Sequence, residues 1–159
     1  MLKLSRVLLA GALFTVASAV GSGQEAVFVT AVPITQFKSG SDERLFGPLE
    51  FLGGIEFSST DNRVQSLSSI RFRPDGTQFV SVSDKGQWLT ARIERDADGR
   101  LSGISKAAVS AILLRSGHAG SKIASDAEGL ALRDGEALVS FEQRHRVDAY
   151  PDPGIGTAA

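Results

Sequence analysis

Short apolar stretches separated by turn residues run along most of the chain, and this pattern predicts β-strands. Residues 88–94 (WLTARIE) show it most clearly, because apolar and polar side chains alternate there with the period of two that a half-buried strand requires. Elsewhere Gly-Pro, Gly-Gly and Asp-Gly pairs interrupt the apolar runs, as expected for bends and hairpin turns. Further strands are predicted at residues 26–32, within 45–57, at 69–73 and 78–83, from 101 onwards, on both sides of 134–135 and at 146–150, whereas residues 106–114 fit either a strand or a helix.

One strand–turn–strand pattern occurs twice, at an offset of about 60 residues. The two copies are SIRFRPDGTQFVSVSD, residues 69–84, and GLALRDGEALVSFEQ, residues 129–143. An alignment with one residue deleted at the turn places Phe79-Val80-Ser81 on Leu138-Val139-Ser140. A unit that recurs at such a spacing is typical of the blades of a β-propeller. The alternative explanation is that two unrelated Asp-Gly hairpins match by chance.

The first 19 residues have the pattern of a secretory signal peptide. Lys3 and Arg6 precede a short apolar core, residues 7–16, and Ala17-Ser18-Ala19 fits a cleavage site of small residues. The apolar core is shorter than the roughly 20 residues of a membrane-spanning helix, so a retained anchor is the alternative rather than the expectation. We therefore expect residues 20–159 to be exported to the periplasm or secreted, with no membrane span after cleavage.

Charge and composition exclude two classes of chemistry. The chain has 17 basic and 18 acidic residues, and loss of Lys3 and Arg6 would leave 15 basic residues and a net charge of −3. No basic stripe is present, which argues against a nucleic-acid partner. The sequence contains no cysteine, so disulfides and thiol chemistry are excluded.

Several motifs, in this order, are similar to the phytase-like esterase family, exported bacterial proteins described by an esterase-like activity of phytase. The segments are FGPLEFLGGIEF, SLSSIRFRPDG, FVSVSDKGQWLTARI, SDAEGLAL and ALVSFEQRHRV. The resemblance covers residues 44–152, and it departs from the family at Ser69, where a glycine is expected. It implies a β-propeller related to calcium-dependent phytases and lactonase-type propellers.

An all-β, incomplete β-propeller of two to three blades, behind a signal-peptide helix, is the fold that these observations predict. Propellers have four to eight blades of about 40–45 residues each, so about 140 mature residues would represent the N-terminal part of a C-terminally truncated domain. Residues 26–32 would then lack a partner strand. Open strand edges and uncovered apolar faces would favour self-association.

Acidic residues stand at the open end of the second hairpin, and their arrangement depends on its register. A three-residue loop, residues 134–136, would place Glu128 opposite Glu142. A two-residue turn would place Glu128 opposite Phe141 and turn Glu142 to the other side. The sequence leaves both registers open. In the first hairpin Asp84 lies just beyond the paired strands, so Asp84 and Glu128 are expected to meet at one mouth of the channel.

Carboxylates at a propeller mouth suit a hard cation, and the resemblance points to Ca²⁺. The predicted ligands are Asp84, Glu128 and Glu142, whose oxygens are the ligands that calcium prefers. Glu128 and Arg144 are the predicted catalytic residues, with Arg144 or, alternatively, Arg146 binding an anionic substrate. Asp126 is expected to support a turn instead, because Ser-Asp before a strand is ordinary turn chemistry.

Metal-assisted hydrolysis of a phosphate or carboxylate ester, with a small-molecule ester as substrate, is the function that this reasoning favours. Propellers also serve as binding modules, so a non-catalytic binding module is the first alternative. An inactive truncated fragment is the second. Calcium-dependent hydrolysis that a chelator abolishes would separate the enzyme from both.

Overall fold

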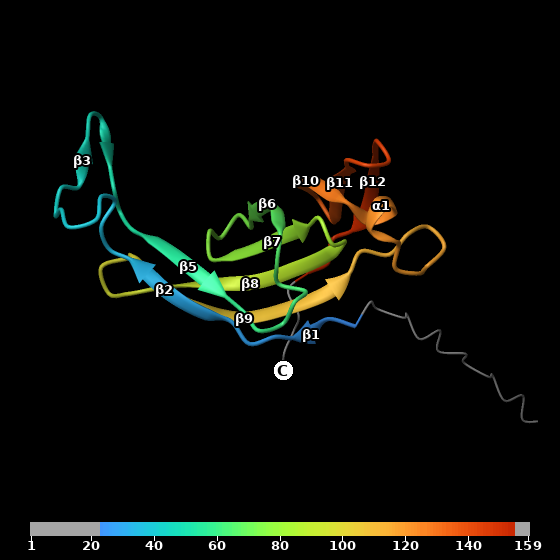
Figure 1. Ribbon diagram of the computed structural model, residues 1–159, viewed down its shortest axis with the longest axis horizontal. Coiled ribbons are helices and arrows are strands. Elements are labelled where there is room, and N and C mark those ends of the chain that lie inside the picture. Colours follow the sequence, from blue (N-terminus) through green and yellow to red (C-terminus); the bar gives the residue numbers. More distant parts are fainter. Residues whose placement is uncertain (1–22, 155–159) are drawn as a thin grey trace, which may run out of the picture.

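The computed structural model describes residues 23–154, whose regular secondary structure consists of β-strands and one short helix (Figure 1). The all-β class expected from the alternating pattern is therefore confirmed. The predicted signal peptide, residues 1–19, lies outside the described residues. Within the described part, no helix has the length and apolar character that a membrane crossing requires.

Two antiparallel meanders make up most of the fold. The larger is a five-stranded sheet in the order β1-β9-β8-β7-β6, and the smaller is a three-stranded sheet in the order β10-β11-β12. No sheet in the described part of the chain closes on itself. The strands of the larger sheet are β1 (Glu25–Ala26), β6 (Leu67–Phe72), β7 (Gln78–Ser83), β8 (Gln87–Arg95) and β9 (Leu101–Ala111), and those of the smaller are β10 (Ala127–Arg133), β11 (Glu136–Phe141) and β12 (Arg146–Pro151).

The N-terminal part of the chain adds two ribbons of two strands each. The first pairs β2 (Thr30–Ile34) with β5 (Gly54–Ser58), and the second pairs β3 (Leu45–Phe46) with β4 (Leu49–Glu50). In Figure 1 the β3–β4 hairpin projects at one end of the long axis, and the three-stranded sheet lies at the other end with α1 (Lys122–Ser125).

The structure corrects one predicted strand and resolves one ambiguous segment. Residues 26–32 are not one unpaired strand, because β1 pairs with β9 and β2 pairs with β5. The strand predicted at residues 26–32 stopped before Pro33, but Pro33 lies inside β2, opposite Ile55. A proline is tolerated there because β2 is an edge strand, where the missing N–H costs no ladder hydrogen bond. The ambiguous residues 106–114 continue β9 as far as Ala111.

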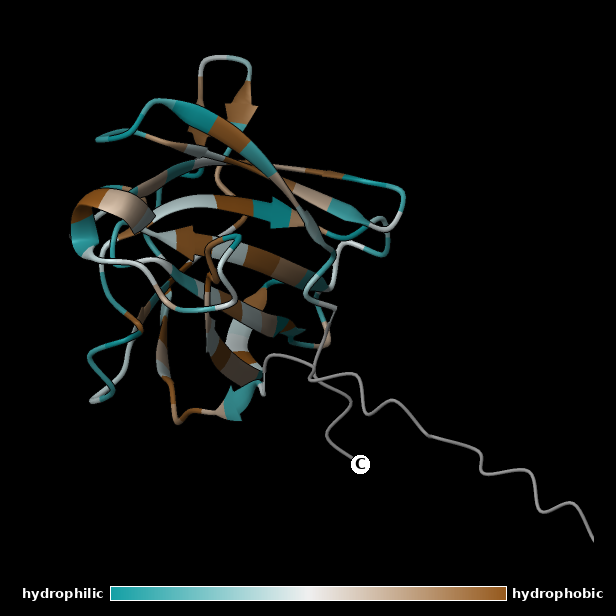
Figure 2. Ribbon diagram, turned by 90° about the vertical axis from the view of Figure 1, so that its right-hand side faces the viewer, coloured by the Kyte–Doolittle hydropathy of each residue, from teal (hydrophilic) through white to brown (hydrophobic). Residues whose placement is uncertain are grey.

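The main hydrophobic core lies between the two meanders. Val80, Val82 and Trp88 enter it from the five-stranded sheet, and Val139 and Phe141 enter it from the three-stranded sheet, all at most 5% exposed. Hydrophobic stretches accordingly run along strands in the middle of the molecule, while several turns are hydrophilic (Figure 2). The strand alternation seen in the sequence therefore serves to bury one face of each sheet against the other.

The opposite face of the five-stranded sheet is only partly covered. Phe79 and Leu89 are buried there beneath the N-terminal segment, and Phe57 of β5 packs against them. The cover does not extend over β6, where Ile70 is 43% and Phe72 is 49% exposed. This leaves an apolar strip along β6 accessible to solvent.

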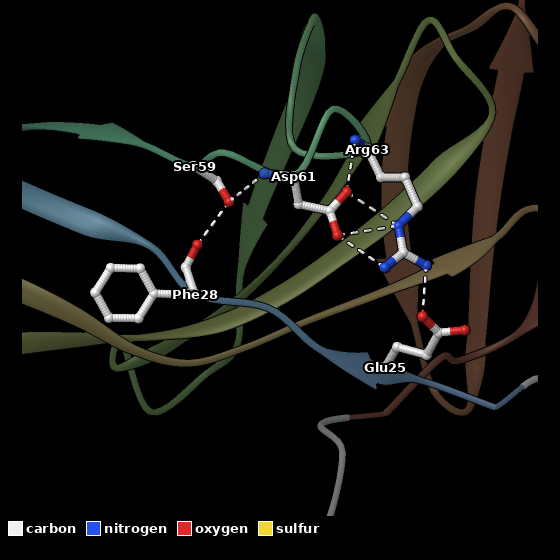
Figure 3. A network of polar contacts seen from close by, with 5 residues as sticks. All are labelled: Glu25, Phe28, Ser59, Asp61 and Arg63. Atoms are coloured by element: carbon white, nitrogen blue, oxygen red, sulfur yellow. Dashed lines mark hydrogen bonds and ion pairs between the residues drawn. The ribbon is translucent and has the colours of Figure 1, made fainter.

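A network of polar contacts fixes the N-terminal segment (Figure 3). Arg63 donates hydrogen bonds to both carboxylate oxygens of Asp61 and, at 2.8 Å, to Glu25 on β1. Ser59 donates to the carbonyl of Phe28 at 2.6 Å and accepts from the amide of Asp61 at 3.1 Å. The hydrogen bonds from Arg63 lower the pKa of Asp61 to about 2, so this carboxylate stays charged through the whole range of ordinary working pH.

The two hairpins predicted to repeat are both present, with a corrected alignment. The second hairpin, β10–β11, turns through two residues, Asp134 and Gly135, whereas the first, β6–β7, turns through four, residues 74–77. Equivalent pairing positions place Phe79 on Ala137, so two residues are deleted at the turn rather than one. Gly135 has a φ of 74°, which explains the need for glycine at this tight turn.

Both hairpins also carry a β-bulge at the same place in their first strand. Ser68 is the extra residue in the first hairpin, and Glu128 is the extra residue in the second. Beyond each bulge a backbone hydrogen bond joins the strand ends, at 3.1 Å in the first hairpin and 2.9 Å in the second. The repeat therefore extends to an irregular feature of the backbone, beyond the Asp-Gly turns.

An ion pair between Arg73 and Asp152 joins the two sheets at the end where the hairpins turn. The guanidinium contacts both carboxylate oxygens, and both side chains are less than a quarter exposed. The hydrogen bonds from Arg73 lower the pKa of Asp152, and burial opposes them only in part. The charged form of Asp152 is therefore stabilised by folding.

We expect Asp152→Asn to lower the free energy of unfolding by about 1–3 kcal/mol at neutral pH, because charge-assisted hydrogen bonds at a partly buried site would be lost. The folded pKa of Asp152 is depressed, so its contribution is complete above about pH 4 and declines as pH falls through the folded pKa. Urea denaturation at neutral and acidic pH measures this change. Asp98→Asn, which breaks an exposed pair with Arg100, serves as the control, and equal losses in both variants would contradict the prediction.

Candidate metal site

Three carboxylates converge where β10 begins and β11 ends. Asp126, Glu128 and Glu142 each offer an oxygen atom, and these atoms lie within 4.8 Å of one another. Asp126 directly precedes β10, Glu128 is the second residue of β10, and Glu142 directly follows β11. The spacing is short enough for one cation to contact all three.

The bulge at Glu128 brings these carboxylates together. The hairpin has the two-residue turn, the register that was expected to separate Glu142 from Glu128. The extra residue shifts the pairing back, so that Ala127 lies opposite Phe141 and the amide of Glu142 donates to the carbonyl of Asp126 at 2.9 Å. A bulge re-aims side chains in this way because two residues of one strand face one residue of the other.

Burial differs sharply among the three acids. The side chain of Asp126 is 5% exposed, whereas Glu128 and Glu142 are exposed. A buried carboxylate needs a partner to offset the loss of hydration. Asp126 therefore forms the inner wall of the group, and the two glutamates can be reached from solvent.

Lys122 supplies the positive charge beside Asp126. Its Nζ atom lies 3.3 Å from Oδ1 of Asp126 and 3.3 Å from Oδ2 of Asp84. Burial on its own would lower the pKa of Lys122, but the hydrogen bonds to Asp84 and Asp126 outweigh it and raise the pKa above its usual value. The ammonium thus stays charged and joins the end of β7 to the start of β10.

Asp84 lies next to the group of three carboxylates but is not a member of it. Asp84 was expected to meet Glu128. Instead, Lys122 connects Asp84 to Asp126. Oδ1 of Asp84 is buried and accepts no hydrogen bond from any described residue. This atom is a free acceptor beside a cluster of negative charge.

The two arginines near the site have different environments. The side chain of Arg144 is exposed in the turn after β11 and forms no ion pair with any residue in 23–154. Arg146 is held in place, because its guanidinium lies 3.7 Å from the ring centroid of Phe141 and donates to Asp148 and to the carbonyl of Ala124 at 2.7 Å each. Arg144 is therefore the one of the two with a side chain free to bind an anion.

Sequence reasoning missed two members of this region. Asp126 was expected only to support a turn, and Lys122 was not among the predicted site residues. A signal was available in the four-residue spacing from Lys122 to Asp126, which brings a lysine and a carboxylate together on one turn of helix. The structure does contain such a turn, α1, between Lys122 and Ser125.

The donor set fits a hard divalent cation. The group offers carboxylate oxygens alone, without the nitrogen or sulfur ligands that zinc favours. Calcium takes six to eight oxygen ligands, so three carboxylates would supply part of its coordination sphere and leave positions for further oxygen ligands such as water. The buried, unpaired Oδ1 of Asp84 adds a further acceptor close to the group.

Comparison with known proteins gave one match. Residues 62–158, more than half of the chain, match a family model described as phytase-like, with esterase-like activity of phytase. The match confirms the family expected from the sequence motifs. No curated protein and no solved structure matches the chain.

Proposed function

The chain belongs to the phytase-like family, and on this premise we propose that it hydrolyses a phosphate or carboxylate ester with the help of a bound Ca²⁺ ion. The observation that carries the proposal is the convergence of Asp126, Glu128 and Glu142 within 4.8 Å. When bound, the cation would polarise the ester oxygen and lower the pKa of a water molecule. The protein's own residues would hold the ion and orient the substrate beside it.

Each residue of the region has a distinct role in this proposal. Asp126, buried and fixed, anchors the cation. Glu128 and Glu142 are exposed and complete the carboxylate group, and Glu128 can in addition accept the proton of an attacking water. Arg144 binds the negative charge of the substrate, since its side chain is exposed and unpaired among the described residues.

We also propose that the two meanders are consecutive blades of a propeller. Strands β6–β9 form one four-stranded antiparallel unit, and β10–β12 supply three strands of the next. Their faces pack together, and β10, the first strand of the second unit, contacts β6, the first strand of the first. In this arrangement the carboxylates stand at one mouth of the channel, and export through the signal peptide would place the site outside the cytoplasm.

Assays of the purified protein with p-nitrophenyl phosphate and p-nitrophenyl acetate test the proposal. We expect hydrolysis of at least one of them in the presence of calcium and loss of that activity in a chelator. Calcium binding without hydrolysis of either ester would favour the non-catalytic binding module. Absence of both would contradict the proposed function.

We expect Glu128→Gln to weaken calcium binding about tenfold or more, because it removes one of three negative charges that contact the ion. Esterase activity should fall with it. The free energy of unfolding should change by less than about 0.5 kcal/mol, since the side chain is exposed. Isothermal titration calorimetry measures the affinity, and Glu56→Gln removes the same charge from the exposed face of β5 as a control. Equal affinity in the two variants would exclude Glu128 as a ligand.

A further inference from the structure

Lys122 bridges the two sheets in a different way from Arg73, because it pairs with two carboxylates rather than one. Its ammonium contacts a carboxylate from each sheet, Asp84 at the end of β7 and Asp126 before β10. The contacts are 3.3 Å each, longer than the 2.7–2.9 Å of a strong charge-assisted hydrogen bond. Lys122 thus places a positive charge near both carboxylates without forming a short hydrogen bond to either of them.

The burial of the partners is unequal. Asp126 is 5% exposed in its side chain, whereas Lys122 is 62% exposed. The lysine can therefore swing into water at little cost, while Asp126 remains where it is. A buried carboxylate without a counter-charge is strongly destabilising, so some cation must stay near Asp126.

We propose that Lys122 is an internal counter-cation that neutralises Asp126 when the metal site is empty and competes with Ca²⁺ for this carboxylate. The inference rests on the proposed function, because it takes Asp126, Glu128 and Glu142 as the calcium ligands. It adds a residue that sets the affinity of the site without being a ligand.

The competition follows from charge and reach. A metal ion bound by Asp126 would lie close to the ammonium, and two like charges at such a distance repel each other. Binding of the ion must displace Lys122 or tolerate this repulsion, and both weaken the observed affinity. Removing the ammonium should therefore strengthen calcium binding, which is the opposite of the effect expected for a ligand or a general structural residue.

Calcium titration of Lys122→Gln by calorimetry tests this inference. The variant should bind calcium about tenfold more tightly than the wild type, and Lys122→Arg, which keeps the charge, should stay near the wild-type value. Lys85→Gln is the matched control, because Lys85 lies beside Asp84 in sequence but contacts only the carbonyl of Asn62 and the amide oxygen of Gln65. It removes the same charge and should change the affinity much less.

Thermal unfolding provides a second readout. In a chelator, Lys122→Gln should melt at a lower temperature than Lys85→Gln, because Asp126 loses its counter-charge. Calcium should then raise the melting temperature of Lys122→Gln by more than that of the wild type. If Lys122→Gln does not fold in chelator, recovery of its circular dichroism spectrum on addition of calcium gives the same answer, and failure to recover overturns the inference.

The two proposals fail in different ways. Equal calcium affinity in wild type, Lys122→Gln and Lys85→Gln would overturn the role of Lys122 and leave the metal site standing. Absence of calcium binding in all three would overturn the metal site, and the inference with it. Tighter binding in Lys122→Gln alone supports both.

Discussion

Replacing Trp88 with alanine is expected to lower the free energy of unfolding by about 3–5 kcal/mol, the loss typical of a large aromatic side chain removed from a core. Trp88 is 5% exposed and belongs to the cluster in which the five-stranded and three-stranded sheets meet. Its ring also contacts Tyr150 of β12 edge-to-face, with 5.7 Å between ring centroids. Truncation would leave a cavity at the junction of the sheets and remove this aromatic pair. Equilibrium unfolding in urea measures the change.

Phe28→Ala is the control for this experiment. Phe28 is 78% exposed, so its truncation removes an aromatic ring without opening a core, and the stability should change by less than about 0.5 kcal/mol. Similar losses in the two variants would contradict the packing of the two sheets on each other. A loss of less than about 1 kcal/mol for Trp88→Ala would do the same.

A Gly86→Ala variant should lose about 2–5 kcal/mol of stability from two separate causes. Gly86 has a φ of +69°, a backbone conformation that costs a side-chain-bearing residue about 1–2 kcal/mol. An added Cβ would also lie 2.5 Å from the Cβ of buried Ser125, and such overpacking costs about 1–3 kcal/mol. Ser125 adjoins Asp126, so the displaced segment would carry the inner wall of the carboxylate group with it. Calcium affinity should therefore fall together with stability.

Gly76→Ala separates the two causes. Gly76 has a similar φ of +65°, but no atom lies within 4 Å of an added Cβ. This variant should show the backbone cost alone and should keep its calcium affinity. Thermal unfolding and calcium titration of both variants distinguish the effects, and equal stability losses would mean that the segment before β10 does not pack against the turn at Gly86.

Much of the fold could be read from the sequence because strands and tight turns leave local signals. The alternation in residues 88–94 lies within β8, and the Asp-Gly pairs mark the turns of both hairpins. Pairing between distant segments leaves no such signal, which is why the partners of β1 and β2 were missed. Residues 106–114 were ambiguous because small and apolar side chains there fit both periods, and contacts with β8 decide for a strand.

The sequence pointed to the end of the hairpin where the carboxylates converge, but not to all of the residues that converge there. Glu128 and Glu142 were identified because they flank the paired strands of one hairpin. Their convergence depends on a bulge, and a bulge is decided by how a strand fits its partner rather than by its own residues. Asp126 was undervalued for a related reason, since its burial follows from the packing of the sheets and of α1. No local pattern encodes that packing.

The bulge occurs in both hairpins, but the side chains around it differ between them. When the two hairpins are aligned by their strand pairing, Ser66, Ser68 and Asp84 of the first correspond to Asp126, Glu128 and Glu142 of the second. The same strand pairing thus carries two hydroxyls and one acid in one copy and three acids in the other. Strand pairing does not depend on which side chains occupy these positions, so a duplicated unit can gain or lose an ion-binding role by a few substitutions while its scaffold stays intact. One hairpin can therefore have a structural role and the other an ion-binding role without any change of topology.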